Sequence, residues 1–426
     1  MTATQFTFIF IAALAFTTFA KLWLARRHLA YIAAHRAAVP EAFRENIQLA
    51  DHQKAADYTS AKTRLAMLGM LFDAALLLAF TLGGGIQFIA DLCRGWFSAP
   101  LAQGMATIVA VLLLSSLLEA PFSLYRTFVI EARFGFNKTT LLLYLTDALK
   151  SLLLGAILGL PLLFGVLWLM ERMGGFWWLY VWLVWVVFNL LILFIYPSFI
   201  APLFNKFTPL QDEAMKARIE ALLARCGFAA QGLFVMDGSK RTAHGNAYFT
   251  GFGKTKRIVF FDTLLERLSG NEVEAVLAHE LGHFKRHHVM KRIVASFVMS
   301  LGFLWLLGLL MQTGWFYQGL GVTHSPFDTS GASGQGSPSA LALLLFFMIL
   351  PIFSFLLHPL LSAYSRKHEF EADSYAARQT AAADLVNALV KLYQDNAATL
   401  TPDPLYSRFY DSHPPAAVRI AHLQAQ

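Results

Sequence analysis

His279, Glu280 and His283 form the pattern H-E-x-x-H, and their side chains can bind a metal ion and move protons. On an α-helix, residues four apart lie on one face, one turn above each other. His279 and His283 can therefore offer two imidazoles to a single Zn²⁺ ion, with the carboxylate of Glu280 beside them. The pattern predicts a zinc site at which metal-assisted hydrolysis could take place.

The residues around this pattern favour a helix independently of the metal. An apolar stripe recurs at helical spacing, at Val273, Leu277, Leu281 and Phe284. We expect Asn271 to cap the N-terminus of this helix, with Glu274 three residues later completing something close to a capping box. The alternative is an ordinary amphipathic helix whose histidines face solvent.

A catalytic zinc site usually takes three protein ligands and leaves one position for water. His287 would extend the histidine series, but eight residues of helix rise about 12 Å, whereas ligating nitrogens lie within ~2.1 Å of one metal. One straight helix cannot supply all three ligands, so the third must come from a distant segment. We expect His287 and His288 to lie at the membrane interface.

The run 365–373 supplies acidic candidates directly after the last apolar segment. Glu369 and Asp373 share one helical face, and Arg366 lies near that face at the i−3 position. We therefore interpret Glu369 as the third zinc ligand, and Asp373 and Arg366 as residues that support the ligands, with Asp373 as an acceptor that orients a ligand imidazole. Glu371 is expected to point away. The alternative is a solvated, charged helix end.

The composition indicates an integral membrane protein. Of the 426 residues, 57% are hydrophobic and only 14% are charged, whereas soluble domains carry about 25% charge. The mean hydropathy of +0.52 agrees. The formal net charge of +7 does not indicate nucleic acid binding, because basic residues are expected in the cytoplasmic loops of membrane proteins. The two cysteines, Cys93 and Cys226, form no C-x-x-C motif, which excludes thiolate zinc and redox motifs.

Seven apolar segments are each near the ~20 residues that cross a bilayer: 5–23, 65–90, 104–125, 151–170, 176–197, 294–314 and 339–363. Twelve Lys and Arg residues lie in the loops expected on one side, and two in those on the other. The positive-inside rule then places the N-terminus outside and the C-terminus in the cytoplasm, with Cys93 and Cys226 on opposite sides of the bilayer. The basic residues of the cytoplasmic loops are Lys21, Arg26, Arg27, Arg36, Arg44, Lys54, Lys62, Arg64, Arg126, Arg133, Lys138 and Lys150, against Arg94 and Arg172.

This topology divides the chain into four parts. Residues 1–197 carry five membrane helices, 198–293 form a cytoplasmic α+β domain that contains the H-E-x-x-H helix, 294–363 carry two more spans, and 364–426 complete the zinc site. Within the second part we expect an amphipathic helix near Gln211–Arg225, strands at Gly232–Met236 and Arg257–Phe261, and turns at Gly251 and Gly253. The stretch 315–338, rich in Gly, Ser and Thr, is expected to be a flexible external loop.

The chain resembles the type 1 CAAX prenyl proteases, membrane-embedded zinc endopeptidases of the gluzincin-like class. The residues that carry the resemblance, besides H-E-x-x-H, are Pro121-Phe122-Ser123-Leu124-Tyr125, Phe128-Val129-Ile130-Glu131, Phe134-Gly135-Phe136-Asn137-Lys138, Tyr196-Pro197, Ala201-Pro202-Leu203-Phe204-Asn205, His244-Gly245-Asn246-Ala247-Tyr248-Phe249, Glu369-Phe370 with Ala372-Asp373, and Ser412-His413-Pro414-Pro415.

The resemblance implies an all-α membrane protein of seven transmembrane helices, which form a barrel around a chamber closed by the zinc domain. It also implies Glu369 as third ligand, Asn246 on a substrate-binding edge strand and His413 near the active centre. Family members remove the C-terminal tripeptide from a prenylated cysteine, whereas bacterial relatives need not have prenylated substrates. The expected partners are the lipid bilayer and a peptide or protein substrate, with no nucleic acid.

The chemistry expected is hydrolysis in which Glu280 takes a proton from water and passes it to the leaving amine, while His413 is a candidate donor to the oxyanion. The expected location is a bacterial inner membrane, or the ER membrane of a eukaryote, with the zinc site on the cytoplasmic side. Two alternatives stay open: a quality-control metalloprotease with non-prenylated substrates, and a transporter or channel that uses its His and Glu residues for ions. The second alternative predicts ionisable residues along the spans rather than at their cytoplasmic ends.

Overall fold

The computed structural model describes residues 1–228, 232–250, 257–323 and 338–426. Within these residues, six helices are long and apolar enough to cross a membrane, and a seventh span results if one bent helix pair is counted. The six are α1 (Ala3–His35), α2 (Leu49–Phe80), α4 (Pro100–Tyr125), α5 (Leu141–Arg172), α6 (Trp177–Ile195) and α11 (His288–Leu310). The bent pair consists of α13 (Pro338–Phe353) and α14 (His358–Gln379).

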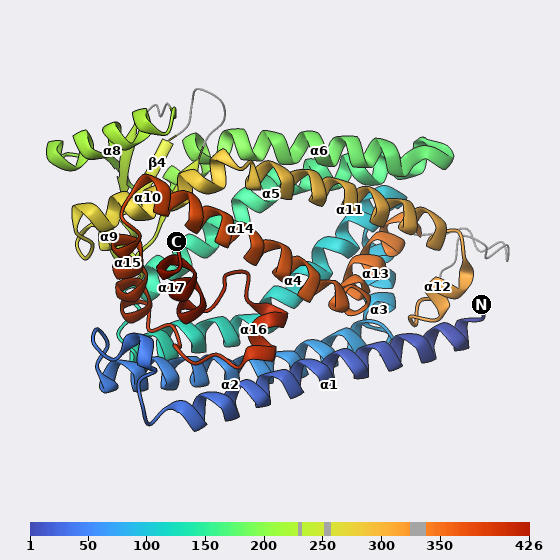
Figure 1. The fold of residues 1–426 in the computed structure, drawn as a ribbon. Helices are drawn as coiled ribbons and strands as arrows, with labels where there is room; N and C mark the ends of the chain where they lie inside the picture. The colour runs from blue at the N-terminus through green and yellow to red at the C-terminus, as the bar shows by residue number, and fades with distance from the viewer. Residues whose placement is uncertain (229–231, 251–256, 324–337) are drawn as a thin grey trace.

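The membrane helices close into a ring. In chain order, α1 contacts α2, α2 contacts α4, and the contacts continue through α5, α6 and α11 to α13, which returns to α1. These helices run lengthwise along the molecule (Figure 1). The six unbroken ones bury only 6–28% of their most apolar windows, because a ring of helices exposes one face to lipid and the other to its interior. The predicted fold, a helical barrel around a chamber, is therefore confirmed.

The second predicted span, 65–90, extends too far toward the C-terminus. Helix α2 begins at Leu49, because the polar residues before the membrane continue the helix, and it ends at Phe80. The chain then turns through Gly84, whose φ of +76° is a left-handed conformation that glycine adopts without strain. A separate short helix, α3 (Gly85–Trp96), follows. Cys93 on α3 and Cys226 are both free, as expected.

The seventh predicted span, 339–363, is broken rather than straight. Helix α13 ends at Phe353, and the chain is bent by 48° before α14. Pro359 lies in the first turn of α14, where its missing N–H group does not interrupt the helical hydrogen bonds. This bend gives α14 a direction of its own, and α14 carries both Glu369 and Asp373.

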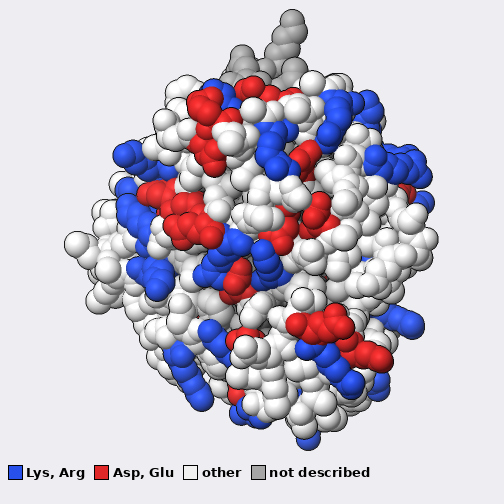
Figure 2. All heavy atoms as spheres, turned by 60° about the vertical axis from the view of Figure 1, so that its left-hand side comes forward, with Lys and Arg blue, Asp and Glu red and all other residues white. Residues whose placement is uncertain are grey.

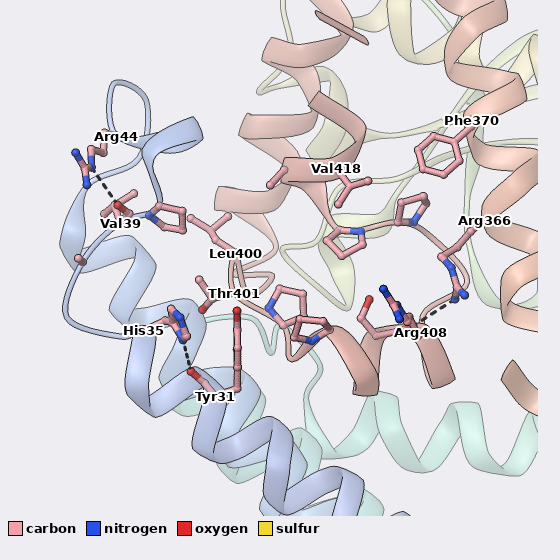
Figure 3. A pocket seen from close by; sticks show the side chains of 18 residues that line it. Tyr31, His35, Val39, Arg44, Arg366, Phe370, Leu400, Thr401, Arg408 and Val418 are labelled. Atoms are coloured by element: carbon pink, nitrogen blue, oxygen red, sulfur yellow. Dashed lines mark hydrogen bonds between the residues drawn. The ribbon is translucent and has the colours of Figure 1, made fainter. Parts of the chain in front are cut away.

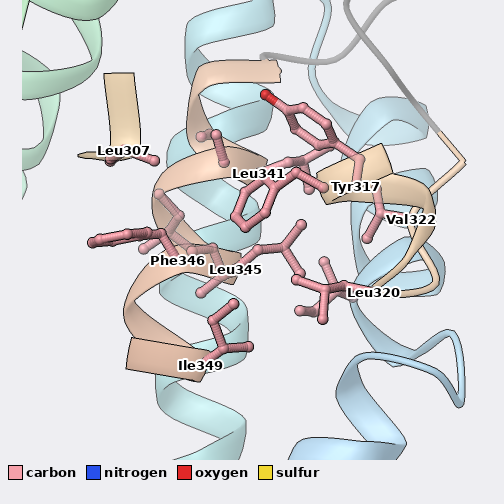
Figure 4. Packing of buried hydrophobic residues seen from close by; sticks show 14 of the residues in the cluster. Leu307, Tyr317, Leu320, Val322, Leu341, Leu345, Phe346 and Ile349 are labelled. Atoms are coloured by element: carbon pink, nitrogen blue, oxygen red, sulfur yellow. The ribbon is translucent and has the colours of Figure 1, made fainter. Parts of the chain in front are cut away.

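The expected external loop at 315–338 begins with packed structure. A short helix, α12 (Gly314–Gln318), buries Phe316 and Tyr317 completely. Figure 4 shows Tyr317, Leu320 and Val322 against Leu341 and Leu345 of α13. The aromatic residues at the start of this stretch bury more apolar surface than a solvated loop would, which explains why a packed helix replaces the predicted flexible loop there. Residues 324–337 of the predicted loop lie outside the described residues.

The part of the chain between α6 and α11 contains a small mixed sheet. Its strands are β1 (Phe207–Pro209), β2 (Leu233–Met236), β3 (Ala247–Thr250) and β4 (Arg257–Phe261), in the order β1-β2-β4-β3. Strands β2 and β4 are parallel, and the other two pairs are antiparallel. The strands predicted from the residue pattern correspond to β2 and β4. The edge strand that the resemblance implies at Asn246 corresponds to β3, which begins one residue later, whereas β1 was not predicted. The predicted turns at Gly251 and Gly253 lie outside the described residues.

Helices pack around this sheet and join the two distant parts of the site. Helix α8 (Glu213–Arg225) matches the predicted amphipathic helix. One hydrophobic core contains buried apolar residues of α8, β4, α10 (Gly270–Lys285), α14, α15 (Ala382–Asp395) and α17 (Ala416–Gln424). The remaining helical elements are η1 (Glu41–Phe43), η2 (Arg126–Glu131), η3 (Gly174–Phe176), η4 (Tyr196–Ile200), α7 (Ala201–Phe204), η5 (Gly238–Lys240), α9 (Asp262–Leu265), η7 (Phe355–Leu357) and α16 (Pro404–Tyr410).

This helical and sheet region lies at the end of the molecule opposite the N-terminus (Figure 1). Figure 2 shows the same end from outside, where Lys and Arg alternate with Asp and Glu. Apolar side chains dominate the surfaces of the long helices instead, as on Leu142 of α5 and Phe194 of α6, which are 76% and 63% exposed. The two kinds of surface are those of a water-facing end and a lipid-facing barrel.

Candidate metal centre

Helix α10 begins two residues earlier than predicted. Ser269 is its N-cap and forms a capping box with Glu272, whose Oε2 accepts a hydrogen bond of 2.7 Å from the backbone N–H of Ser269. The predicted capping pair, Asn271 and Glu274, binds arginines of α8 instead: Arg218 donates to both residues, and Arg225 donates to Glu274. The predicted apolar stripe is confirmed, since Val273, Leu277 and Leu281 are buried.

Helices α10 and α14 approach each other closely at Gly282. A Cβ atom at this position would lie 2.9 Å from the Cα of Ala372, closer than real Cβ contacts allow. The glycine of the sequence His279-Glu280-Leu281-Gly282-His283 therefore allows the backbones to meet. As a result, Glu369, one turn before Ala372, reaches the two histidines.

Gly282→Ala should separate the two helices and weaken metal binding strongly, because the two nearest atoms belong to the backbone of Ala372 and cannot rotate away. Gly302→Ala is the matched control: this α11 glycine has open space around it, so alanine should be neutral or stabilise the helix by up to ~1 kcal/mol. Both variants can be purified and compared by zinc content and melting temperature. Full zinc content in Gly282→Ala would contradict the packing argument.

The structure brings His279, His283 and Glu369 together, with one candidate ligand atom from each residue within 4.8 Å of the others. The Nε2 atoms of the two histidines are 3.2 Å apart. Glu369 places Oε2 at 3.4 Å from His279 Nε2 and Oε1 at 3.3 Å from His283 Nε2. Two donors bound to one tetrahedral Zn²⁺ at 2.0–2.2 Å are themselves roughly 3.3 to 3.5 Å apart. The three side chains therefore fit a metal ion.

The charge of this cluster also favours a cation. Glu369 is 3% exposed, and its Oε2 atom has no hydrogen-bond partner among the described residues, which is costly for a buried carboxylate. Burial by itself would lower the pKa of His279, but the carboxylates of Asp373 and Glu369 beside its ring raise it to about 9. The site thus attracts positive charge, which a divalent metal would supply between the three donor atoms.

Asp373 lies where the sequence places an orienting acceptor. Its Oδ1 atom is 2.8 Å from Nδ1 of His279, which leaves Nε2 of that ring for the cluster. Arg419 of α17 holds the carboxylate with two hydrogen bonds, of 2.6 and 2.9 Å, and is itself buried. Sequence reasoning missed Arg419, because a single arginine on a short C-terminal helix carries no pattern that points to a distant aspartate.

His287 and His288, which are adjacent in sequence, differ in burial in the structure. His287 is exposed, as expected of an interfacial residue, and it adopts a left-handed conformation with φ of +57° between α10 and α11. His288 is completely buried instead, and its Nδ1 atom is 3.0 Å from Nδ1 of His283. The expectation for His288 is therefore wrong, because the sharp change of direction at His287 returns the next side chain toward the cluster.

Glu280 and Asn246 line one cavity of about 380 Å³ together with His279, His413 and Arg419. Asn246 directly precedes β3, and β3 has a partner on only one side among the described strands. The backbone of an extended peptide could pair with that edge. His413 lies at the rim, with Nε2 at 3.4 Å from Oε1 of Glu369. The cavity thus brings together one candidate metal ligand, His279, the acid Glu280 and an open strand edge.

Arg366 has a different position from the one predicted. Its guanidinium donates to the backbone oxygens of Ser407 and Asp411, at 3.4 and 2.7 Å, and so holds the segment that leads to His413 rather than the ligand imidazoles. Figure 3 shows Arg366 in a larger cavity of about 760 Å³, between the end of α1 and the C-terminal helices. That cavity contains none of the three clustered side chains, so we place the candidate site in the smaller one.

Comparisons with known proteins cover both halves of the chain. Residues 28–206 match the family described as CAAX prenyl protease N-terminal, five membrane helices, and residues 209–426 match peptidase family M48. A CAAX prenyl protease 1 homolog from Oryza sativa subsp. japonica is 39% identical over 322 residues, covering 75% of this chain and 73% of the relative. CAAX prenyl protease 1 from Saccharomyces cerevisiae is 34% identical and covers 90% and 88% of the two chains.

A solved structure has the same fold over nearly its whole length. The crystal structure of S. mikatae Ste24p superimposes with a TM-score of 0.90 at 32% identity, and the match covers 98% of this chain and 99% of that one. The match thus includes both halves of the chain, the barrel and the part that carries His279, His283 and Glu369. The chain belongs to peptidase family M48 and, within it, to the CAAX prenyl protease 1 group of integral-membrane metallopeptidases.

Proposed function

We propose that this chain is a zinc endopeptidase in which His279, His283 and Glu369 bind one Zn²⁺ ion. The observation that carries the proposal is that one donor atom from each residue lies within 4.8 Å of the others. The two imidazole Nε2 atoms are 3.2 Å apart, and each faces a different oxygen of Glu369 at 3.3 or 3.4 Å, which suits a tetrahedral ion. Two histidines and an acid are a ligand set that leaves one position for water at catalytic zinc sites. When bound, Zn²⁺ would supply Lewis acidity that activates water and polarises the scissile carbonyl.

Glu280 is proposed as the general base. It follows His279 directly on α10 and lines the same cavity, so its carboxylate can take a proton from water and return it to the leaving amine. Asp373 keeps the proton of His279 on Nδ1, at 2.8 Å, so that Nε2 presents its lone pair to the cluster. His413 at the rim is proposed as a donor to the oxyanion that forms during attack.

The substrate is proposed to bind as an added strand. The outer edge of β3 faces no other described strand, and Asn246 stands at its start within the cavity. A peptide extended along this edge would exchange backbone hydrogen bonds with β3. Its scissile bond would then lie beside Glu280 and the metal cluster.

We propose that the site faces the cytoplasm, with residues 198–293 and 364–426 forming the peptidase part and the two membrane parts, 1–197 and 294–363, forming the barrel. The support is the excess of Lys and Arg in the loops on the side of the cluster. In the structure, the N-terminus lies at the opposite end of the barrel from α10 and the C-terminus (Figure 1).

The proposed substrates are proteins that carry a prenyl group on a cysteine followed by a C-terminal tripeptide. The curated relatives are named CAAX prenyl proteases, and a site beside the bilayer suits a lipid-modified peptide. Purified protein should cleave a peptide with a farnesylated cysteine faster than the same peptide with a free cysteine. Equal rates on both would instead favour a membrane quality-control protease, and no cleavage of either would contradict the peptidase assignment.

A further inference from the structure

His288 connects a proposed zinc ligand to a carboxylate on another helix. Its Nδ1 atom is 3.0 Å from Nδ1 of His283, and its Nε2 atom is 3.0 Å from Oε2 of Glu371. The His288 side chain is completely buried, whereas that of Glu371 is 30% exposed. The three groups therefore form a chain of hydrogen bonds from the metal cluster toward the surface.

The direction of each hydrogen bond follows from the chemistry of the partners. An ionised carboxylate only accepts, so Nε2–H of His288 donates to Glu371. In neutral imidazole the other nitrogen is then an acceptor, so Nδ1 of His288 accepts from Nδ1–H of His283. His283 is left with an unprotonated Nε2, the atom that faces His279 and Glu369. The chain thus selects the ring form of His283 that can bind a metal.

The local backbone is built to place His288 there. On a continuous helix a residue five positions after His283 would point about 140° away from it. The left-handed conformation of His287 ends α10 and starts α11, which brings His288 back beside His283. The ring of His288 then stacks on that of His368, with centroids 3.9 Å apart and planes at 8°. Burial and stacking hold the ring in one orientation.

We infer that His288 is a positioning residue for the metal ligand His283, with Glu371 as its outer anchor. It would do for His283 what Asp373 does for His279, but through an imidazole rather than a carboxylate. The inference rests on the proposed metal site. Partners of this kind typically change metal affinity 10- to 100-fold when they are removed.

The test is the zinc affinity of the purified full-length chain, measured by competition with a chelator. His288→Ala should weaken zinc binding by about 10- to 100-fold. His287→Asn is the matched control, since the neighbouring side chain is exposed and asparagine tolerates the left-handed conformation; its affinity should equal that of the unmodified chain. His288→Asn should recover part of the affinity, because its Oδ1 atom can accept from His283 where Nδ1 did.

Glu371→Ala gives a second, milder test on a partly exposed residue, which covers the case in which His288→Ala fails to fold. It should weaken zinc binding less than His288→Ala, and it should have no further effect when His288 is already alanine, because the two residues act in series. Losses that simply add in the double variant would overturn the chain of hydrogen bonds.

The outcomes separate this inference from the proposed function. If the unmodified chain binds one zinc and both His288→Ala and Glu371→Ala bind it equally tightly, the positioning role is wrong while the zinc site stands. If the unmodified chain binds no zinc, the metal site itself is wrong and the inference falls with it. Melting temperatures measured with chelator present show whether a variant has lost its fold rather than its affinity for zinc.

Discussion

Glu280→Gln is expected to abolish peptide cleavage while one zinc ion stays bound to each chain. Glutamine has nearly the same shape as glutamate but does not accept a proton from water. Loss of a general acid–base group typically costs 10²- to 10⁴-fold in rate. None of the three atoms that face the metal position belongs to Glu280, so the affinity for zinc should not change.

Zinc content per chain and turnover of a peptide substrate are the two measurements for this variant. Glu220→Gln, an exposed residue on α8, provides the matched control, because it makes the same change of charge outside the cavity. The control should retain both zinc and activity. Turnover by Glu280→Gln at the rate of the unmodified chain would remove Glu280 from the mechanism and would require another base in the cavity.

Glu369→Ala is expected to remove both the metal and the activity. The carboxylate supplies one of three donors and the negative charge opposite two imidazoles. Without it, two neutral imidazoles remain on α10, and a site with two protein ligands holds zinc weakly. The loss of affinity should exceed the roughly 10- to 100-fold effect of losing an outer partner. His279→Ala should have the same consequence.

Thermal unfolding makes this prediction measurable without a substrate. An ion that binds only the folded chain stabilises it by about 2.7 kcal/mol at a concentration 100 times its Kd. Zinc should therefore raise the melting temperature of the unmodified chain and of Glu280→Gln, but not of Glu369→Ala. A zinc-dependent increase of equal size in Glu369→Ala would show that the ion binds elsewhere.

Local features of the candidate site could be predicted from the sequence because they depend on short spacings. Helical periodicity places His279 and His283 on one face, and the same rule pairs Glu369 with Asp373 on another helix. The apolar segments similarly predict most of the membrane helices. The capping prediction failed by two residues, since Ser269 and Asn271 both suit an N-cap and the arginines of α8 decide which one is free to act.

Features that arise from contacts between distant segments had no local signal. Arg419 reaches Asp373 across 46 positions of the chain, and β3 is held in the sheet by its antiparallel pairing with β4. His288 looks like its neighbour His287 in sequence, yet one is buried against the cluster and the other is exposed. The difference depends on a single left-handed residue, whose conformation is set by how α10 and α11 pack.

The sequence by itself determined the kind of chemistry, the helix that presents two imidazoles, and the membrane-embedded class of the protein, because residue type and helical or bilayer-length periodicity are local properties. Only the tertiary structure decided how closely α14 approaches α10 at Gly282, which partners hold each imidazole, and where the seventh span bends. Those features depend on which helix surfaces pack against each other when the chain folds. Close packing between helices involves residues from several segments, so no single segment of the sequence determines it.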